Sequence, residues 1–337
     1  MATLDIFNDD AFSVTSLSQT IVDIPEVPTR LGDRGLFSEY GINTLSFMIE
    51  RQGSALKLLP TAPRGGVREP VNLGKRKLIT LQAVHIPVSW SVLADEVQGV
   101  RAFGSETEVD QVSKIVARKL KVVRDSMDLT LEWHRLGALK GLVLDADSTP
   151  ILNVYEAFGM TQQTLYTDLD NQAGVDPKVF IWNLKAAMKA KMGGRSFSRI
   201  RVICSTSFFT KLVSADKMKK AWELYQANQF ARTDQIAAGD FEWLNVIFEI
   251  YDGAIGETDF IEEDTAYAYP EGVPGMFQMA FAPADYMETV NTEGQAFYAK
   301  QEPMPFNKGV AGEAQSNPLA FNSLPEAVIK LSTAASA

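Results

Sequence analysis

The chain has 337 residues, of which 46% are hydrophobic and 22% charged, a composition typical of a globular protein with one large core or two smaller ones. Its 32 basic and 42 acidic side chains leave a formal charge of -10, which excludes nucleic-acid binding over the general surface because phosphate binding needs clustered positive charge. The single cysteine, Cys204, excludes an intramolecular disulfide, and no apolar run reaches the roughly 18 to 20 residues of a membrane helix.

Residues 1–42 show little hydrophobic periodicity and are interrupted by prolines and glycines. They contain scattered apolar residues, among them Phe7 and Phe12, whereas a disordered tail would be poorer in such residues. We therefore expect an extended arm that lies on another surface. The first ten residues lack the charged and apolar regions of a signal peptide, so we expect a chain that is made and kept in a cytoplasm-like compartment.

Residues 43–50, 54–59 and 78–93 are rich in β-forming residues and flank a loop at 60–77. That loop holds three prolines, three glycines and five basic residues against one acid, which indicates an exposed segment. Together the stretches predict a long two-stranded ribbon with a basic tip. Because such a ribbon is marginal alone in water, it must rest on its own domain or on a neighbour.

One long helix is predicted from Ser105 to Gly137, about 45 Å in length. Ser105 and Glu108 form a capping box at its start, and Gly137 offers a left-handed stop. Apolar residues recur every three or four positions, at Val109, Val112, Val116, Leu120, Val123, Met127 and Leu131. A basic stripe runs along another face, at Lys114, Arg118, Lys121 and Arg124. This stripe is either a solvated face or a surface along which something acidic lies.

Strands and helices alternate in the remainder of the chain. Asp176 and Pro177 begin a helix in the expected way, with an N-cap aspartate and a proline at the first helical position. Further helices are expected at 207–213 and 216–229. Strands are expected at 142–144, 151–155, 199–204, 244–251, 265–269, 276–281 and 295–301 and near the C-terminus. This order indicates an α+β fold with a compact helix–strand domain over 157–283.

A possible catalytic motif follows the strand at 142–144. The pattern Asp145-x-Asp147-x-Thr149 resembles the nucleophile motif of haloacid-dehalogenase-type phosphatases, in which the first aspartate is phosphorylated and the second is the general acid/base. However, residues 150–155 read as a returning strand, and no acidic pair of the expected form follows downstream. We interpret the motif as a hairpin turn whose side chains bond to local backbone.

Other catalytic and cofactor patterns are missing from the sequence. His85 and His134 are the only histidines and form no triad or zinc site with neighbouring residues. The chain has neither a phosphate-binding loop nor a dinucleotide-binding glycine motif. We therefore expect no enzyme activity, no metal and no cofactor, and a chain that is built to contact copies of itself.

Several stretches, in this order along the chain, resemble one known family. They are Pro60 to Gly66, Gly141 to Asp147 with Tyr155 to Gly159, Ile203 to Phe209, and Asn317 to Leu319 with Ser323 to Leu331. On these residues the chain resembles the major capsid proteins of tailed bacteriophages, of the lambda-type capsid protein E family with the Hong Kong 97-type fold. The resemblance covers nearly the whole chain.

The resemblance implies a division of the chain into named parts. These are an N-terminal arm (1–42), an extended β-ribbon loop (43–93), a peripheral domain (94–156) with its spine helix at 105–137, an axial domain (157–283), and a return to the peripheral domain with a C-terminal strand (284–337). It also implies a structural protein of the virion head, assembled in the host cytoplasm. Hexamers and pentamers would mature from a procapsid into an icosahedral shell around the genome.

The partners implied are copies of the chain, scaffold, portal and decoration proteins, and packaged double-stranded DNA that is bound without sequence specificity, with no membrane. The residues expected at contacts between subunits are Arg64, Gly65, Gly66, Arg68, Lys75, Arg76, Lys77, Lys114, Arg118, Lys121, Phe7 and Phe12. Two alternatives are the shell of an encapsulin-like nanocompartment and a phosphatase that uses Asp145 and Asp147. The family motifs favour the virus over the nanocompartment.

Overall fold

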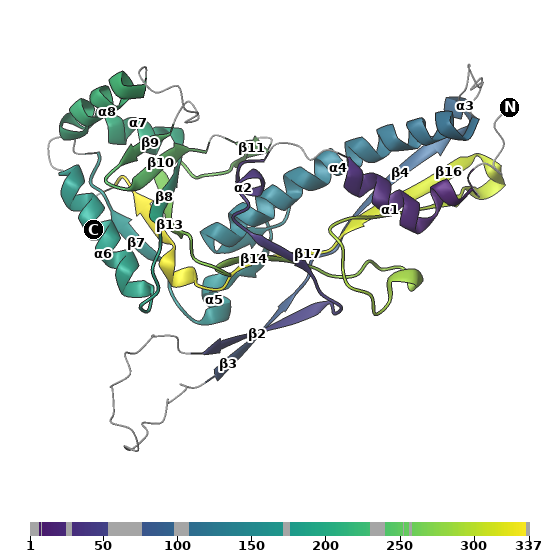
Figure 1. Ribbon diagram of the computed structural model, residues 1–337, viewed down its shortest axis with the longest axis horizontal. Coiled ribbons are helices and arrows are strands. Elements are labelled where there is room, and N and C mark those ends of the chain that lie inside the picture. Colours follow the sequence, from purple (N-terminus) through teal and green to yellow (C-terminus); the bar gives the residue numbers. More distant parts are fainter. Residues whose placement is uncertain are drawn as a thin grey trace, which may run out of the picture.

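The structure is a computed structural model, and it describes residue 7 and residues 9–24, 29–52, 76–97, 108–170, 176–229, 240–251, 253–255 and 258–334. Figure 1 shows an elongated molecule, with a helix-covered sheet at one end and a long helix, α4, running toward the other. A two-stranded ribbon, β2–β3, extends to one side. Helices and strands mix along the chain, which confirms the α+β class.

The sheet at one end has six strands in the order β7–β18–β13–β8–β10–β9. Its central strand β8 runs parallel to β10 and antiparallel to β13, and five consecutive residues of β8 are buried because the sheet is covered by helices. The strands are β7 (Gln163–Tyr166), β8 (Arg199–Cys204), β9 (Phe241–Trp243), β10 (Val246–Ile250), β13 (Thr265–Glu271) and β18 (Ile329–Ser332). Strand β18 comes from the C-terminal end of the chain, so the two halves of the sequence share this sheet.

Three helices surround the six-stranded sheet: α6 (Pro177–Lys191), α7 (Thr206–Ser214) and α8 (Asp216–Gln229). The predicted start of α6 is confirmed, since the Asp176 side chain accepts a hydrogen bond from the Lys178 backbone N–H at 3.0 Å. Ser205 caps α7 in the same way through the Phe208 N–H, at 3.3 Å. We call the sheet with these helices the six-stranded domain.

The other end of the molecule contains two three-stranded sheets that pack on α4 (Glu108–Lys140). One sheet has the order β1–β14–β17, from Ser38–Gly41, Phe277–Phe281 and Pro318–Asn322. The other has the order β15–β16–β4, from Tyr298–Pro303, Gly309–Ser316 and Ile86–Leu93. Short elements complete the fold: η2 (Asp10–Phe12), α3 (Ala94–Val97), β5 (Leu142–Leu144), β6 (Pro150–Asn153), α5 (Val154–Phe158), β11 (Ala254–Ile255), β12 (Thr258–Asp259), η3 (Met287–Thr289), η4 (Pro305–Asn307) and η5 (Pro325–Ala327).

The apolar stripe predicts the long helix, and the structure buries that stripe from Val112 to Leu131, whereas the Val109 side chain lies outside the described part. The buried residues are Val112, Val116, Leu120, Val123, Met127 and Leu131. The stripe faces the sheets and the N-terminal segment, so α4 connects the layers of this end of the molecule. The predicted capping residue Ser105 lies outside the described residues.

The predicted end of the long helix at Gly137 is wrong, because α4 continues to Lys140. The left-handed residue is Gly141, with φ +89°. Gly137 has a different role: a Cβ there would lie 2.8 Å from the Val143 Cα and 2.9 Å from the Leu142 carbonyl oxygen. The glycine therefore lets strand β5 pass directly against the helix.

Where the structure describes the N-terminal segment, it is largely helical and not extended as its sequence suggested. Residues Val14–Asp23 form helix α1, which Ser13 caps by accepting a hydrogen bond from the Ser16 N–H at 3.3 Å. Leu17 and Ile21 are buried in the same core as α4. Val14, Leu17 and Ile21 recur every three or four residues, a short apolar stripe that the sequence interpretation overlooked.

The ribbon pairs β2 (Ser46–Gln52) with β3 (Arg76–Gln82) in antiparallel register, as expected. Its base rests on its own chain, because the Phe47 and Phe321 rings lie 5.8 Å apart and Ile79 joins the same cluster. The expectation that residues 78–93 continue the ribbon is wrong in part. Strand β4 pairs with β16 in a different sheet. The predicted strand at 54–59 lies outside the described residues.

Gly137→Ala tests the close approach of α4 and β5. Helix propensity alone predicts a stabilisation of about 1 kcal/mol. We instead expect the free energy of unfolding to fall by about 1 to 3 kcal/mol, because the new methyl group must displace backbone. Urea unfolding of the folded subunit measures this. Ser126→Ala, on an exposed face of the same helix, is the control and should change stability by less than about 0.5 kcal/mol. A stabilised Gly137→Ala variant would contradict this account.

Candidate interaction surfaces

The Asp145–Thr149 segment is the hairpin turn between β5 and β6, as the sequence indicated. The Asp145 carboxylate accepts from the Ala146 N–H at 2.7 Å, and the Asp147 carboxylate accepts from the Thr149 N–H at 2.9 Å and from its hydroxyl at 2.6 Å. The Thr149 hydroxyl and N–H hold the pKa of Asp147 below its ordinary value. Both carboxylates are thus used for local turn structure, with the side chains exposed on the hairpin.

Other candidates for chemistry are dispersed among the described residues. His85 contacts the Asn317 side chain through Nδ1 at 2.8 Å, whereas His134 is buried in α4. Cys204 is buried, and burial raises the pKa of its thiol well above the ordinary value, as is typical of a structural cysteine. Within the described ranges no group of three or more His, Cys, Asp or Glu could hold a metal ion, and no helix is long and apolar enough to cross a membrane.

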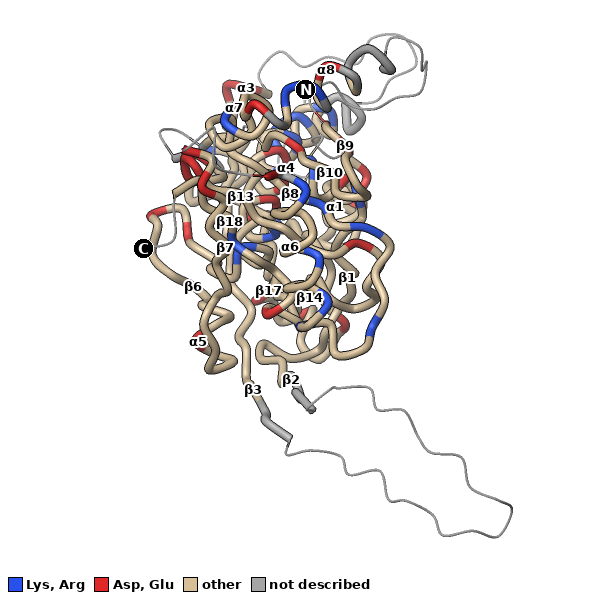
Figure 2. The backbone as a smooth tube through the Cα atoms, turned by 90° about the vertical axis from the view of Figure 1, so that its left-hand side faces the viewer, with Lys and Arg blue, Asp and Glu red and all other residues tan. Residues whose placement is uncertain are grey.

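The predicted basic stripe of α4 is only partly a surface. Lys114, Arg118 and Lys121 are exposed, and Lys121 forms an ion pair with Asp125 at 3.3 Å. Arg124, which was expected on the same face, is buried: it bonds Asp128 at 2.8 Å and the Ile21 carbonyl at 2.9 Å. Basic and acidic residues are interspersed over the described chain in Figure 2. The stripe is therefore a short exposed group with acidic neighbours.

The remaining predicted contact residues fall into two groups. Five residues of the loop tip, Arg64, Gly65, Gly66, Arg68 and Lys75, lie outside the described residues, and Arg76 and Lys77 begin β3. The two N-terminal phenylalanines are placed by the structure: their ring centroids are 5.3 Å apart, and Phe12 is buried in the core of its own subunit. Only part of the Phe7 ring remains exposed for another chain.

A buried carboxylate, that of Glu132 on α4, connects three segments that are distant in sequence. It is 2% exposed and accepts hydrogen bonds from the Leu31 N–H at 2.7 Å, from the Gly32 N–H at 3.2 Å and from the Tyr251 hydroxyl. The two amides belong to the short helix α2 (Arg30–Asp33), and Tyr251 follows β10. Arg135 supplies the opposite charge, 3.6 Å away. Glu132 therefore joins the long helix to the six-stranded domain through α2.

A second buried carboxylate, that of Glu249 on β10, adds to the connection between α4, α2 and β10, which we call the joint. Arg34, just after α2, lies 2.5 Å from it, and Arg201 on β8 lies 3.1 Å from it. Arg201 also forms an ion pair with Glu271. Burial raises the pKa of the Glu271 carboxyl, but Arg201 and Arg199 outweigh this effect and hold it below its ordinary value. Arg135 is only three residues from Glu132, but Glu249 lies 215 residues from Arg34 and 48 residues from Arg201. Sequence spacing therefore did not reveal this set of contacts.

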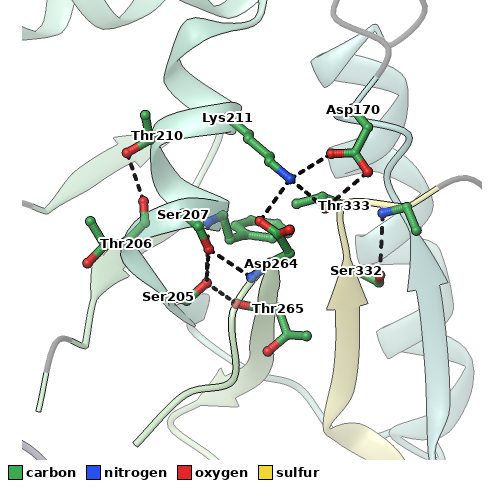
Figure 3. A network of polar contacts seen from close by, with 12 residues as sticks. Asp170, Ser205, Thr206, Ser207, Thr210, Lys211, Asp264, Thr265, Ser332 and Thr333 are labelled. Atoms are coloured by element: carbon green, nitrogen blue, oxygen red, sulfur yellow. Dashed lines mark hydrogen bonds and ion pairs between the residues drawn. The ribbon is translucent and has the colours of Figure 1, made fainter. Parts of the chain in front are cut away.

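The Ser205 to Ser207 region, part of the stretch that suggested a family, has a structural role that Figure 3 shows. Ser205 donates to the Thr265 carbonyl at 3.1 Å, and the Ser207 hydroxyl accepts from the Asp264 N–H at 2.8 Å. Lys211 lies between two aspartates, 2.7 Å from Asp170 and 2.8 Å from Asp264. These contacts connect α7 to the segments beside β13, β7 and β18.

Large apolar side chains that are exposed on the single chain form a class that sequence reasoning missed. Phe306 is 91% exposed and Met287 87% exposed. Others, each at least 56% exposed, are Val122, Met48, Leu45, Trp182, Val290 and Val179. Periodicity does not identify them, because several lie in turns. Exposed apolar residues that are scattered singly are ordinary, so exposure alone does not mark any of these residues as a contact site.

Comparison with known proteins finds similarity to phage capsid proteins over nearly the whole chain. A family model described as phage major capsid protein E matches residues 13–333. The chain is 24% identical to the major capsid protein of Salmonella phage Felix O1, over 94% of this chain and 95% of that protein. It is also 24% identical to the major capsid protein of Pseudomonas phage KPP10, over 95% and 96%. Its fold is similar to that of the capsid protein of Ralstonia phage GP4, with a TM-score of 0.52, 10% identity and 94% of each chain covered.

Glu132→Gln tests the joint between α4, α2 and β10. The substitution keeps the shape of the side chain but removes the charge that Arg135 and the α2 amides require. We expect the free energy of unfolding to fall by about 3 kcal/mol, as when a buried ion pair is broken. The control is Glu96→Gln, whose ion pair with Lys119 is exposed and is expected to contribute less than about 1 kcal/mol. Equal effects of the two variants in urea unfolding would contradict a buried joint.

The stability of the subunit should fall as the pH is lowered from 6.5 toward 4. Burial lowers the pKa of His134 to about 4, with a smaller opposing effect from Asp145. In this window the unfolded chain binds a proton that the folded chain does not, which costs up to about 1.4 kcal/mol of stability per pH unit. His134→Gln should reduce this slope. Parallel stability profiles of wild type and variant, measured by denaturant unfolding, would show that His134 is not the group responsible.

Proposed function

This chain belongs to the phage major capsid protein E family, and we propose that its copies assemble into hexamers and pentamers that close an icosahedral shell around the phage genome. It is a structural protein of the virion head with the Hong Kong 97-type fold, not an enzyme. The observation that carries this function is the family match over residues 13–333, which includes every sheet of the described fold. The two phage relatives favour a virus head over a nanocompartment.

The parts of the subunit receive the following roles in the proposal. Residues 1–42 are the N-terminal arm, which α1 anchors on its own subunit, and 43–93 contain the extended loop. Residues 157–283 supply most of the six-stranded domain, which we assign as the axial domain. Residues 94–156 and 284–337 supply most of the peripheral domain around α4, whose sheets also include β1, β4 and β14. Strand β18 is an exception within the last range, because it completes the sheet of the axial domain.

The contacts between subunits are proposed from charge and exposure. The basic residues of the loop, Arg64, Arg68, Lys75, Arg76 and Lys77, reach acidic groups of an adjacent subunit. The exposed group Lys114, Arg118 and Lys121 and the exposed part of Phe7 add further contacts. Charged contacts of this kind set orientation more than affinity. Many weak contacts, repeated by symmetry, then give a stable closed shell.

The proposed partners other than copies of the chain follow from the same role. Scaffold, portal and decoration proteins bind the shell during or after assembly, and the shell matures from a procapsid. Packaged double-stranded DNA lies inside without sequence-specific contacts. The formal charge of -10 suits a shell that does not hold DNA tightly.

Electron microscopy of the recombinant chain, co-expressed with its scaffold partner, tests both the function and the loop. Wild type should form closed shells. Arg64→Glu combined with Arg68→Glu should leave a folded subunit without shells, because two attractive contacts per subunit become repulsive. The control reverses the exposed Lys189 and Lys191 on α6 and carries the same change in net charge. Normal shells from the loop variant would remove the role of the tip but not the function, whereas no shells from wild type would contradict the function.

A further inference from the structure

The turn between β15 and β16 presents an aromatic ring to solvent. Phe306 has φ +62° and ψ +20°, a left-handed conformation that is an outlier for a bulky residue and stores backbone strain. Its side chain is 91% exposed. The folded subunit therefore gains neither burial nor relaxed backbone from a phenylalanine at this position. A glycine or asparagine would be favoured if the turn had no role other than to connect two strands.

The turn is held firmly on both sides. The Met304 N–H donates to the Gly309 carbonyl at 2.9 Å, and the Ala94 N–H donates to the Lys308 carbonyl at 3.0 Å. The Lys308 ammonium lies 5.9 Å from the centroid of the Phe306 ring. The backbone of the turn is thus held in place, and it presents an aromatic side chain with a cation beside it. We call Phe306 and Lys308 the Phe306 tip.

A pocket that fits such a unit lies at the base of the β2–β3 ribbon. It has a volume of about 440 Å³, and Leu45, Ala83, Ala284 and Val290 supply apolar wall while Asp285 adds an exposed carboxylate. Leu45 is 63% and Val290 57% exposed, so the apolar wall is open to solvent in the single subunit. We call this the Leu45–Val290 pocket. An apolar cavity of about 150 Å³ holds a benzene ring, so the pocket has room for a phenyl group and part of a lysine side chain.

The walls of the Leu45–Val290 pocket are also preformed. The Ala83 N–H donates to the Leu45 carbonyl at 2.9 Å, and the Asn317 amide donates to the Pro283 carbonyl at 2.9 Å. The Asp285 N–H is bonded to the Gln315 side chain at 3.0 Å, which fixes the backbone that carries the carboxylate. A guest would therefore bind without the cost of ordering the walls.

We propose that the Phe306 tip of one copy inserts into the Leu45–Val290 pocket of a second copy, with Lys308 beside Asp285. The inference rests on the proposed assembly of many copies. Two features of the tip match two features of the pocket. The exposed Phe306 ring matches the exposed apolar wall, and the Lys308 cation matches the Asp285 carboxylate. Insertion into the pocket of its own subunit is excluded, because the ring is 91% exposed there.

The location of the two features determines what kind of contact this is. Gly309, which ends the turn, pairs with Leu93 next to α3, and Figure 1 places α3 at the end of the molecule opposite the six-stranded domain. The base of the β2–β3 ribbon lies near the middle of the molecule, beside β17, in the same figure. A contact between two different patches is heterologous, so it propagates from copy to copy and closes only by symmetry. One inserted ring is a small contact, and it contributes through repetition in the shell.

Cysteine pairs identify the neighbour of the tip directly. Cys204 is buried, so introduced thiols are the accessible ones. Chains carrying Pro305→Cys, which keep the Phe306 ring, and chains carrying Val290→Cys are co-expressed, assembled and oxidised with diamide. We expect disulfide-linked dimers that contain one chain of each kind and are missing when either variant is assembled alone. The control replaces the second variant with Trp182→Cys, an exposed site on α6. Shells without the expected dimer, or equal dimer formation with the control, would overturn the inference and leave the capsid function intact.

Particle yield gives an independent measure. Phe306→Gly relieves the strained backbone, so the folded subunit should be at least as stable as wild type to heat, yet shell yield should fall about tenfold with loss of a buried aromatic anchor. Phe306→Tyr keeps the ring and should restore the yield. Lys308→Glu should lower the yield, and Lys308→Glu combined with Asp285→Lys should recover it. A wild-type shell yield from Phe306→Gly would overturn the inference. A double variant, Lys308→Glu with Asp285→Lys, whose shell yield is no higher than that of Lys308→Glu alone would also overturn it. Failure of wild type itself to form shells would count against assembly as a whole.

Discussion

Two buried carboxylates, Glu132 and Glu249, are the constraint on which the shape of this subunit depends. A buried charge is tolerated only when partners surround it, and these partners come from α2, α4, β8 and β10. Once Glu132 accepts the amides of α2 and Arg34 reaches Glu249, the long helix and the six-stranded domain meet through a short N-terminal segment. The orientation of the two ends of the molecule is thus determined by charge as well as by apolar packing.

The buried interactions of this subunit are concentrated at the joint and along α4. Elsewhere its surface carries apolar side chains that the subunit itself does not cover. Among the described residues, Phe47, Ile79 and Leu81 pack the base of the ribbon on its own subunit. Apolar side chains such as Phe306 and Leu45 remain in solvent. Such surfaces would be a liability in a protein that acts alone. In the proposed shell, symmetry-related copies would cover these surfaces, so their exposure on the single subunit is consistent with that proposal.

The local features of the fold were readable from the sequence where short-range rules decide them. The apolar stripe of α4, the N-cap of α6 at Asp176 and the turn at Asp145 were all predicted, and the structure confirms them. Gly137 was misread because a glycine near the end of a helix suggests a stop, whereas here it makes space for β5. Helix α1 was missed because its apolar stripe has only three members, Val14, Leu17 and Ile21, and a ten-residue helix gains its stability from burial, here against α4 and β15.

The sequence by itself determined the α+β class, the long helix, the exclusion of disulfides and metal clusters of cysteine, and the resemblance to capsid proteins, since these follow from composition, periodicity and ordered short motifs. Only the tertiary structure decided that β18 completes the six-stranded sheet, that Arg124 is buried, and that Phe306 is exposed on a strained turn. The physical reason is the separation in sequence over which each interaction acts. Helix periodicity and caps act within a few residues, whereas burial and charge pairing depend on segments up to hundreds of residues apart.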